Sequence, residues 1–230
     1  MMLQFLAFFL LAAFSYASVH FSRHYAKKRQ LLDRPNERSS HIIPTPRGGG
    51  LGIVVLVLLT GVLFLNDAGW NRRLIYLVGA AVIAWLGWRD DLHSLSPRIR
   101  FVVQGLVAGV SIWRLVYFKV VNIPMFGELQ LGFAGIIITF LWIIGLTNAY
   151  NFMDGIDGMA GGVALSAGIG WMWLASNINN PFLFWIVLAI TASSLGFLGH
   201  NWSPAKIFMG DVGSTFLGYS FAVLPLISSD

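Results

Sequence analysis

The 230-residue chain contains 57% hydrophobic and only 11% charged residues, and its mean hydropathy is +0.72. These values exclude an ordinary soluble globular domain and favour a single helical membrane domain over residues 1–230. The absence of cysteine excludes disulfides and thiolate metal sites, and the net charge of +5 is uneven, because seven of the 15 Lys and Arg lie between Arg23 and Arg47.

Eight apolar stretches approach the length of about 20 residues that a membrane-spanning helix needs. In chain order they cover approximately residues 2–21, 50–65, 74–90, 99–118, 131–150, 158–176, 182–200 and 212–227. The first stretch has no basic segment before it and is followed by positive charge, so we expect a retained helix with its N-terminus outside rather than a signal peptide. The predicted fold class is all-α, a polytopic transmembrane helix bundle.

Alternation of the eight stretches divides the connecting segments between the two sides of the membrane. Segments 22–49, 89–98, 151–157 and 201–211, with the adjoining Arg100, hold 11 Lys and Arg, whereas 66–73, 119–130 and 177–181 hold three. The positive-inside rule therefore assigns the first group to the cytoplasm. We interpret the basic run after the first stretch as a contact with anionic membrane lipid and expect no nucleic acid partner.

Carboxylates mark the cytoplasmic ends of these stretches. Asp90 and Asp91 end the third stretch, and adjacent carboxylates repel each other unless a cation or Arg89 offsets the repulsion. A solvated helix end is the simpler interpretation of such a pair. We favour a functional one, because two further acidic segments are predicted on the same side and a carboxylate beside a membrane span is costly.

The second acidic segment, 148–158, has the sequence NAYNFMDGIDG and ends the fifth stretch. Its polar residues recur at every third position, a spacing that drifts around a helix, so we expect the helix to break near Gly155 and Gly158 and to wrap these groups around a ligand. Carboxylate and amide oxygens suit Mg²⁺, which also binds substrate phosphates. The polar residues in question are Asn148, Asn151, Asp154 and Asp157.

Two glycine-rich segments flank helix starts. Arg47, Gly48 and Gly49 precede the second stretch, where a glycine turn can cradle phosphate and the arginine can pair with a diphosphate. Asp211 opens the eighth stretch after Gly210. It can either cap that helix, together with Ser214, or bind a metal, and the two roles are compatible.

Four ordered motifs carry a resemblance to a known family. They are SSHIIPTPRGGG at 39–50, DDLHSLSP at 90–97, NAYNFMDGIDG at 148–158 and AKIFMGDVGS at 205–214. The chain resembles the polyprenyl-phosphate N-acetylhexosamine-1-phosphate transferases of glycosyltransferase family 4, which include the undecaprenyl-phosphate GlcNAc-1-phosphate transferase and the phospho-MurNAc-pentapeptide translocase. Its PRGGG form is most similar to the branch that initiates O-antigen or surface polysaccharide.

The resemblance implies a function and roles for individual residues. It implies transfer of an N-acetylhexosamine-1-phosphate from a UDP-N-acetylhexosamine to undecaprenyl phosphate in the bacterial inner membrane, with Mg²⁺ or alternatively Mn²⁺ as cofactor and cytoplasmic active-site loops. Asp90 and Asp91 match the catalytic acidic pair. Asn151 and Asp211 match Mg²⁺ positions, and Asp154 and Asp157 match the segment lining the nucleotide. A homodimer is left open.

The chain also departs from the family pattern. Members carry further C-terminal spans and a late cytoplasmic loop rich in His or in Arg and His, which are missing here, so an inactive truncated homologue is one alternative. A secondary transporter for an anionic solute is another, although transporters place polar groups near the membrane midplane. The loop residues His41 and His93 are expected to be exposed polar side chains rather than metal ligands.

Overall fold

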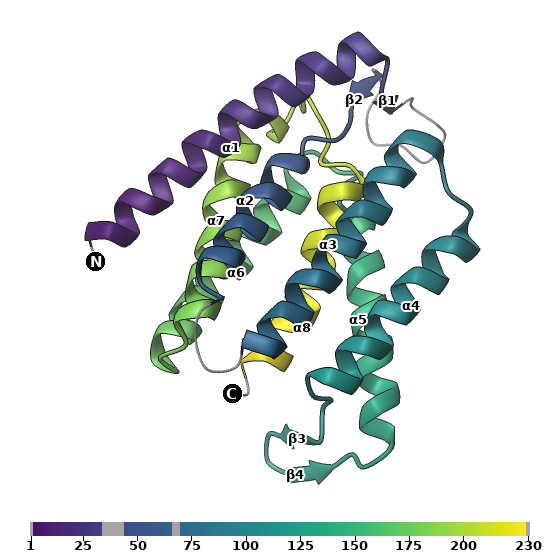
Figure 1. Ribbon diagram of the computed structural model, residues 1–230, viewed down its shortest axis with the longest axis vertical. Coiled ribbons are helices and arrows are strands. Elements are labelled where there is room, and N and C mark those ends of the chain that lie inside the picture. Colours follow the sequence, from purple (N-terminus) through teal and green to yellow (C-terminus); the bar gives the residue numbers. More distant parts are fainter. Residues whose placement is uncertain (1, 34–43, 66–69, 229–230) are drawn as a thin grey trace.

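A computed structural model describes residues 2–33, 44–65 and 70–228. Arg34, Arg38 and His41 lie outside these ranges. Within them the chain forms eight helices, one for each predicted stretch: α1 (Met2–Arg29), α2 (Leu51–Leu63), α3 (Trp70–His93), α4 (Pro97–Arg114), α5 (Ala134–Met153), α6 (Met159–Asn177), α7 (Pro181–Asn201) and α8 (Asp211–Ile227). The helical fold class is confirmed (Figure 1).

Four helices are long and apolar enough to cross a membrane by length and composition: α1, α5, α6 and α7. Two more, α2 and α8, are apolar but have only 13 and 17 residues. Helix α3 carries charged residues at both ends, and α4 carries arginines at its two ends. The described helices therefore form a polytopic membrane bundle in which individual members differ in length and polarity.

Local sequence explains several helix boundaries. Helix α4 begins with Pro97 after Ser96, whose hydroxyl accepts the backbone N–H of Ile99. Helix α7 begins in the same way, because Asn180 precedes Pro181 and its side-chain oxygen accepts the N–H of Leu183 at 3.0 Å. Proline lacks an N–H that the first turn would leave unpaired, and the capping side chain satisfies another.

Two short antiparallel strand pairs interrupt the helical pattern. Strand β1 (Leu32–Asp33) pairs with β2 (Thr45–Pro46), and β3 (Val120–Ile123) pairs with β4 (Gly127–Gln130). Helix α4 ends at Arg114, before the end of the expected span over 99–118. The exposed β3–β4 hairpin lies within residues 119–130, which were expected to form an outward-facing connection. Val120 and Val121 there are β-branched, which favours an extended backbone.

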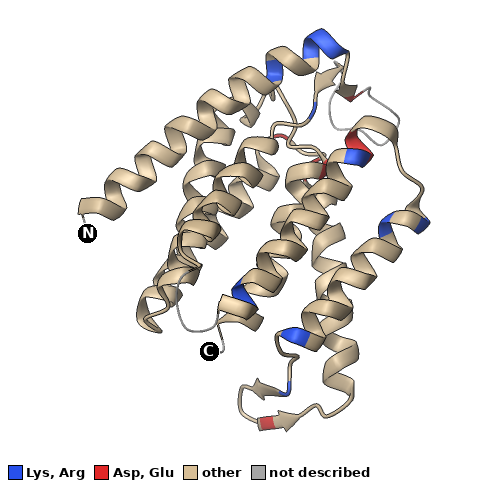
Figure 2. Cartoon of the chain, in the orientation of Figure 1, with Lys and Arg blue, Asp and Glu red and all other residues tan. Residues whose placement is uncertain are grey.

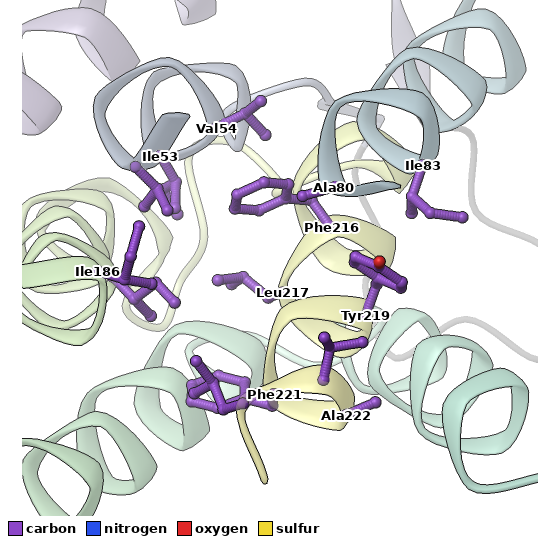
Figure 3. Close-up of a cluster of buried hydrophobic side chains, with 14 of the residues drawn as sticks. Ile53, Val54, Ala80, Ile83, Ile186, Phe216, Leu217, Tyr219, Phe221 and Ala222 are labelled. Atoms are coloured by element: carbon purple, nitrogen blue, oxygen red, sulfur yellow. The ribbon is translucent and has the colours of Figure 1, made fainter. Parts of the chain in front are cut away.

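Helix α8 occupies the centre of the bundle. It packs against α3 on one side and α5 on another, and nearly every side chain along it is buried. Figure 3 shows Phe216, Leu217 and Tyr219 of α8 surrounded by apolar side chains of the neighbouring helices. Burial on all sides is typical of a core helix rather than of a lipid-facing one.

Charged residues gather at the two ends of the bundle. Figure 2 shows Lys, Arg, Asp and Glu near the helix ends and long uncharged stretches between them. The end of α3, whose last turn carries Asp90 and Asp91, lies at the same end of the bundle as the last turn of α1 (Figure 1). This distribution agrees with a hydrocarbon layer across the middle, where an ionised side chain is costly.

The close approach of α5 and α8 generates a test of this packing. A Cβ added at Gly218 would lie 2.7 Å from the Cα of Thr147 and 2.8 Å from the carbonyl oxygen of Leu146. Gly218→Ala should therefore force the helices apart and destabilise the protein by about 1–3 kcal/mol, measured by thermal unfolding in detergent. Gly145→Ala on the outer face of α5 is the matched control, because nothing lies within 4 Å of its added methyl group. Equal melting temperatures for the two variants would contradict the packing described.

Candidate active site

Four segments that are far apart in the sequence meet at one end of the bundle. They are the end of α3, the α5–α6 turn, the segment leading into α8, and the segment between β2 and α2. Together with β1 they enclose a polar pocket of about 160 Å³. Its lining consists of Asp33, Arg47, Asp91, Asn151, Asp154, Gly155, Phe208, Gly210 and Asp211.

Asp91 caps the N-terminus of α8 from the neighbouring helix α3. Its Oδ1 accepts the backbone N–H of Asp211 and its Oδ2 accepts that of Val212, both at 3.0 Å. Capping of α8 by Asp211 or Ser214 was one possibility from the sequence. In the structure the N-cap residue is Gly210, and no side chain of α8 caps the helix. A carboxylate at a helix N-terminus is stabilised by unpaired N–H groups and by the helix dipole.

Gly210 is required at this junction. Its φ is +78°, a left-handed conformation that favours glycine. A Cβ there would also lie 2.7 Å from Asp91 Oδ2 and 2.9 Å from the backbone nitrogen of Gly48. The residue before α8 therefore has both a conformational and a steric reason to lack a side chain.

Asp154 binds the backbone immediately before α8. Its two carboxylate oxygens accept the backbone N–H groups of Met209 at 3.0 Å and Gly210 at 2.7 Å. Burial raises the pKa of Asp154 to about 7, although these two hydrogen bonds oppose the rise. The nearby Asp91 adds to the rise by charge repulsion, so a cation in the pocket would favour the ionised form.

Asp90 and Asp211 form a second acidic group beside the pocket. Their carboxyl groups lie within hydrogen-bonding reach of each other. Arg100 Nη1 lies 2.8 Å from Asp90 Oδ2 and 3.5 Å from Asp211 Oδ2, and Asp90 also accepts the N–H of Leu95. The two carboxyl groups therefore share a single guanidinium.

Arg47 joins the glycine-rich segment to the acidic site. Its Nη2 donates to the backbone oxygen of Asp91 at 2.6 Å, and its Nε lies 3.9 Å from Asp91 Oδ1. The N–H of Gly49 donates to the Phe208 carbonyl at 3.0 Å. The amide of Gly49 is thus used within the protein, whereas Gly48, with φ +96°, lies at the edge of the site.

The α5–α6 turn breaks where the sequence predicted. Helix α5 ends at Met153, and Gly158 adopts a φ of +72° before α6 begins. Asn151 faces the pocket and its Oδ1 accepts the Ser214 hydroxyl at 3.2 Å. Asp157 lies outside the pocket lining and accepts the N–H of Ala205 at 2.9 Å.

Asn148 is also placed away from the pocket. Its amide nitrogen donates to Gln104 Oε1 at 2.7 Å and to the Ile144 carbonyl at 2.8 Å, so it connects α5 to α4. The structure thus brings Arg47, Asp91, Asn151, Asp154 and Asp211 to one cavity and sets Asn148, Asp157 and Gly49 beside it. Their roles toward a substrate stay predictions.

Sequence reasoning missed Asp33, Arg100 and Phe208 as members of the site. Asp33 and Phe208 line the pocket, and Arg100 pairs with both Asp90 and Asp211. The signal for Arg100 was available, because an arginine in the first turn of the next helix can reach back to an acidic pair. His93 is exposed, as expected.

The side chains of the pocket that could bind a metal ion would all do so through oxygen atoms. Among the residues that the structure describes, no group of three His, Cys, Asp or Glu side chains is arranged to hold a metal by itself. Mg²⁺ does not need such a cage, since it keeps several waters and binds through one or two carboxylates together with substrate phosphates. Asp211 and Asn151 on the pocket wall fit that demand.

The fold and the pocket together define a polytopic helical membrane protein with a polar, carboxylate-lined cavity at one end of its bundle. Residues 73–229 match the model of glycosyl transferase family 4. The chain belongs to this family, which confirms the family resemblance.

Individual relatives agree with this assignment. The chain is 37% identical over 89% of its length to the "Probable undecaprenyl-phosphate N-acetylglucosaminyl 1-phosphate transferase" of Bacillus subtilis, covering 57% of that protein. It is 33% identical over 86% of its length to the decaprenyl-phosphate N-acetylglucosaminephosphotransferase of Mycobacterium leprae, covering 54% of it. It is also 34% identical over 81% of its length to the phospho-N-acetylmuramoyl-pentapeptide-transferase of Chlamydia muridarum, covering 61%. The chain spans between half and two thirds of the length of these relatives.

The two carboxylates of the α5–α6 turn provide a paired test of the site's construction. Asp154→Asn should destabilise the protein by about 1–3 kcal/mol, because its amide group would face a backbone N–H with no acceptor. Asp157→Asn should change stability by no more than about 0.5 kcal/mol, since one oxygen suffices for its single bond to Ala205. Thermal unfolding in detergent compares the two, and an equal or larger loss for Asp157→Asn would refute the assigned roles.

Proposed function

We propose that this protein transfers N-acetylglucosamine-1-phosphate from UDP-N-acetylglucosamine to undecaprenyl phosphate and releases UMP. The main support for this proposal is that Asp91, Asn151, Asp154 and Asp211 converge on one polar pocket at the end of a hydrophobic bundle. One substrate is water-soluble and the other is held in the bilayer by its tail, so the reaction needs a site at the interface. The names of the relatives in Bacillus and Mycobacterium support the choice of sugar and of a polyprenyl phosphate, and the Bacillus name supports undecaprenyl phosphate.

The reaction is a phosphoryl transfer. A phosphate oxygen of the lipid attacks the sugar-linked phosphorus of the nucleotide sugar and forms a new P–O–P linkage. The bond from that phosphorus to the bridging oxygen of the original diphosphate breaks, and its electron pair leaves with UMP. Such reactions are catalysed mainly by positioning and by electrostatic stabilisation of the phosphates.

Asp211 and Asn151 are the residues that would hold Mg²⁺. The ion supplies charge neutralisation at the diphosphate and at the leaving phosphate. The contact between the carboxyl groups of Asp90 and Asp211 supports this assignment, because two such groups beside a single Arg100 favour binding of a further cation. Arg47, which lines the same pocket, provides a fixed positive charge for a phosphate.

The acidic pair at the end of α3 acts by positioning rather than as a general base. A phosphate monoester has a second pKa of about 6 and is mostly dianionic at neutral pH, so there is little proton to remove. Both oxygens of Asp91 already accept N–H groups at the start of α8. Asp90 orients Arg100, which in turn neighbours Asp211.

We place the site on the cytoplasmic side of a bacterial inner membrane. The basic last turn of α1, with Lys27, Lys28 and Arg29, lies at the same end of the bundle as the acidic pocket (Figures 1 and 2). Positive charge flanking a span favours the cytoplasmic side. The same charges attract both anionic substrates toward the pocket.

The pathway that uses the lipid-linked product is also part of the proposal. The PRGGG motif at 46–50 favours initiation of O-antigen or another surface polysaccharide, and other UDP-N-acetylhexosamines are alternative donors. Mn²⁺ is an alternative metal, and a homodimer stays a prediction. A transporter is disfavoured because the polar groups gather at one end of the bundle, whereas transporters place them near the midplane.

Product formation tests the proposed reaction directly. Washed membranes containing the full-length protein should convert radiolabelled UDP-N-acetylglucosamine and undecaprenyl phosphate to a labelled lipid, because transfer moves the sugar phosphate onto the acceptor. EDTA should abolish the product and added Mg²⁺ should restore it. A panel of UDP-N-acetylhexosamines identifies the donor. Uptake of label into vesicles without any lipid-linked product would instead establish a transporter.

A substitution at the pocket tests the assignment of Asp211. Asp211→Asn should lower the turnover rate by about a hundredfold, the effect of losing one electrostatic stabiliser of a transition state, while the membrane level of the protein is unchanged. Glu128→Gln in the exposed β4 strand removes a carboxylate that lies outside the pocket lining and should leave turnover unaltered. Near-full activity of Asp211→Asn would remove this residue from the proposed site.

A further inference from the structure

The β3–β4 hairpin has two faces of opposite polarity. Residues that lie directly opposite each other in an antiparallel pair point to the same face, and neighbours along a strand point to opposite faces. The register pairs Val121 with Leu129 and Asn122 with Glu128. One face therefore carries Val121, Ile123 and Leu129, and the other carries Val120, Asn122, Glu128 and Gln130.

The apolar face of the hairpin is left uncovered by the part of the chain that the structure describes. All eight strand residues are exposed, and Val121, Ile123 and Leu129 are 41%, 37% and 50% exposed. A two-stranded hairpin with no surface to pack on is marginally stable in water. A hydrophobic surface against this face would therefore stabilise the hairpin.

The turn of the hairpin presents two more apolar side chains. The N–H of Phe126 donates to the Ile123 carbonyl at 3.0 Å across Pro124 and Met125. Met125 has a φ of +72°, a conformation that favours glycine, but it carries a long apolar side chain. Met125 and Phe126 are 100% and 87% exposed. The apolar surface of the hairpin thus extends over its tip.

The hairpin lies at the depth of the membrane interface. Figure 1 shows it beyond the ends of α4 and α5, at the end of the bundle opposite the polar pocket. Helix α5 has 20 residues, and a helix of that length is about 30 Å long, the thickness of the hydrocarbon core. Because the Met153 end of α5 lies at the polar pocket, the residues before Ala134 lie at the opposite boundary of the core.

The lipid-facing surface of the bundle continues into the hairpin. Trp113 at the end of α4 and Phe133 before α5 are exposed, and an open apolar groove of about 550 Å³ runs between the two helices. Arg114 lies 5.3 Å from the centre of the Trp113 ring, and Lys119 lies 5.9 Å from that of Tyr117. Aromatic and basic side chains together are typical of the interface, where a cation can meet lipid phosphate.

We propose that the β3–β4 hairpin lies on the leaflet opposite the polar pocket as an amphipathic ribbon. Val121, Ile123 and Leu129 face the acyl chains, and Met125 and Phe126 enter the interface beside them. The partner is the phospholipid surface itself. The hairpin then anchors the far ends of α4 and α5, the two helices that carry Arg100 and Asn151 to the site. This inference does not depend on the proposed reaction.

The depth of a spin label tests the hairpin's position, because the chain contains no cysteine and a single one can be introduced. Leu129→Cys places a nitroxide on the apolar face, and the adjacent Glu128→Cys places one on the polar face as the matched control. The full-length protein is studied in vesicles of phosphatidylcholine and phosphatidylglycerol. Paramagnetic relaxation by oxygen, which enriches in the acyl chains, is compared with relaxation by a water-soluble nickel chelate. The Leu129→Cys label should lie about 5–10 Å into the boundary between headgroups and acyl chains, whereas the nickel chelate should relax the Glu128→Cys label preferentially.

Three results would overturn the proposal. Equal access of the nickel chelate to both labels would place the hairpin in water. A Leu129→Cys label shielded from both reagents would show that protein covers the apolar face. Dipolar broadening between labels would identify a second copy of the chain as the partner.

Val121→Cys, directly opposite Leu129, measures the same face independently, so poor folding of one variant leaves the test intact. It should report the same depth as Leu129→Cys, and a water-exposed label at this position would contradict the proposal. Formation of lipid-linked product is not a readout here, so failure of the proposed reaction and failure of this inference are distinguishable.

Discussion

Two buried carboxylates determine how the chain enters its central helix. Asp154 accepts the N–H groups of Met209 and Gly210, and Asp91 accepts those of Asp211 and Val212. Four consecutive backbone donors are thus satisfied by acids from two other parts of the chain. An unpaired buried N–H costs about 1–3 kcal/mol, so this arrangement fixes both the position of α8 and the position of the acids. The polar pocket is formed where these constraints meet.

The same arrangement explains how acidic groups are tolerated at the end of an apolar bundle. Asp91 and Asp154 are each less than a tenth exposed, but their charge faces backbone donors and the cation Arg47 rather than hydrocarbon. Buried charge is costly unless it is paired and hydrogen-bonded. The protein pairs these acidic groups only in part, because Asp90 and Asp211 share the single guanidinium of Arg100. A site in which two carboxyl groups share one cation is suited to a hydrated divalent cation and its phosphate ligands.

Much of the fold followed from hydropathy and turn chemistry. Eight apolar stretches gave eight helices, and the break at Gly158 fell between α5 and α6. The hairpin of β3 and β4 lies in the predicted outward connection over 119–130, and its strand pairing was not predicted because two four-residue strands are too short to give a clear alternating pattern. The convergence of the acidic segments was predictable from alternation alone. The capping of α8 by Asp91 was not, because it depends on which helices are neighbours in space.

Helix α8 is both the most enclosed helix and the eighth to be synthesised. Its neighbours α3 and α5 are made much earlier and must leave a vacancy between them until it arrives. A ribosome-bound intermediate that ends before residue 209 therefore has Asp91 and Asp154 without the backbone donors that they serve in the finished bundle. The polar pocket and the packing of the bundle are therefore completed together, because both depend on the arrival of α8 and of the segment that leads into it.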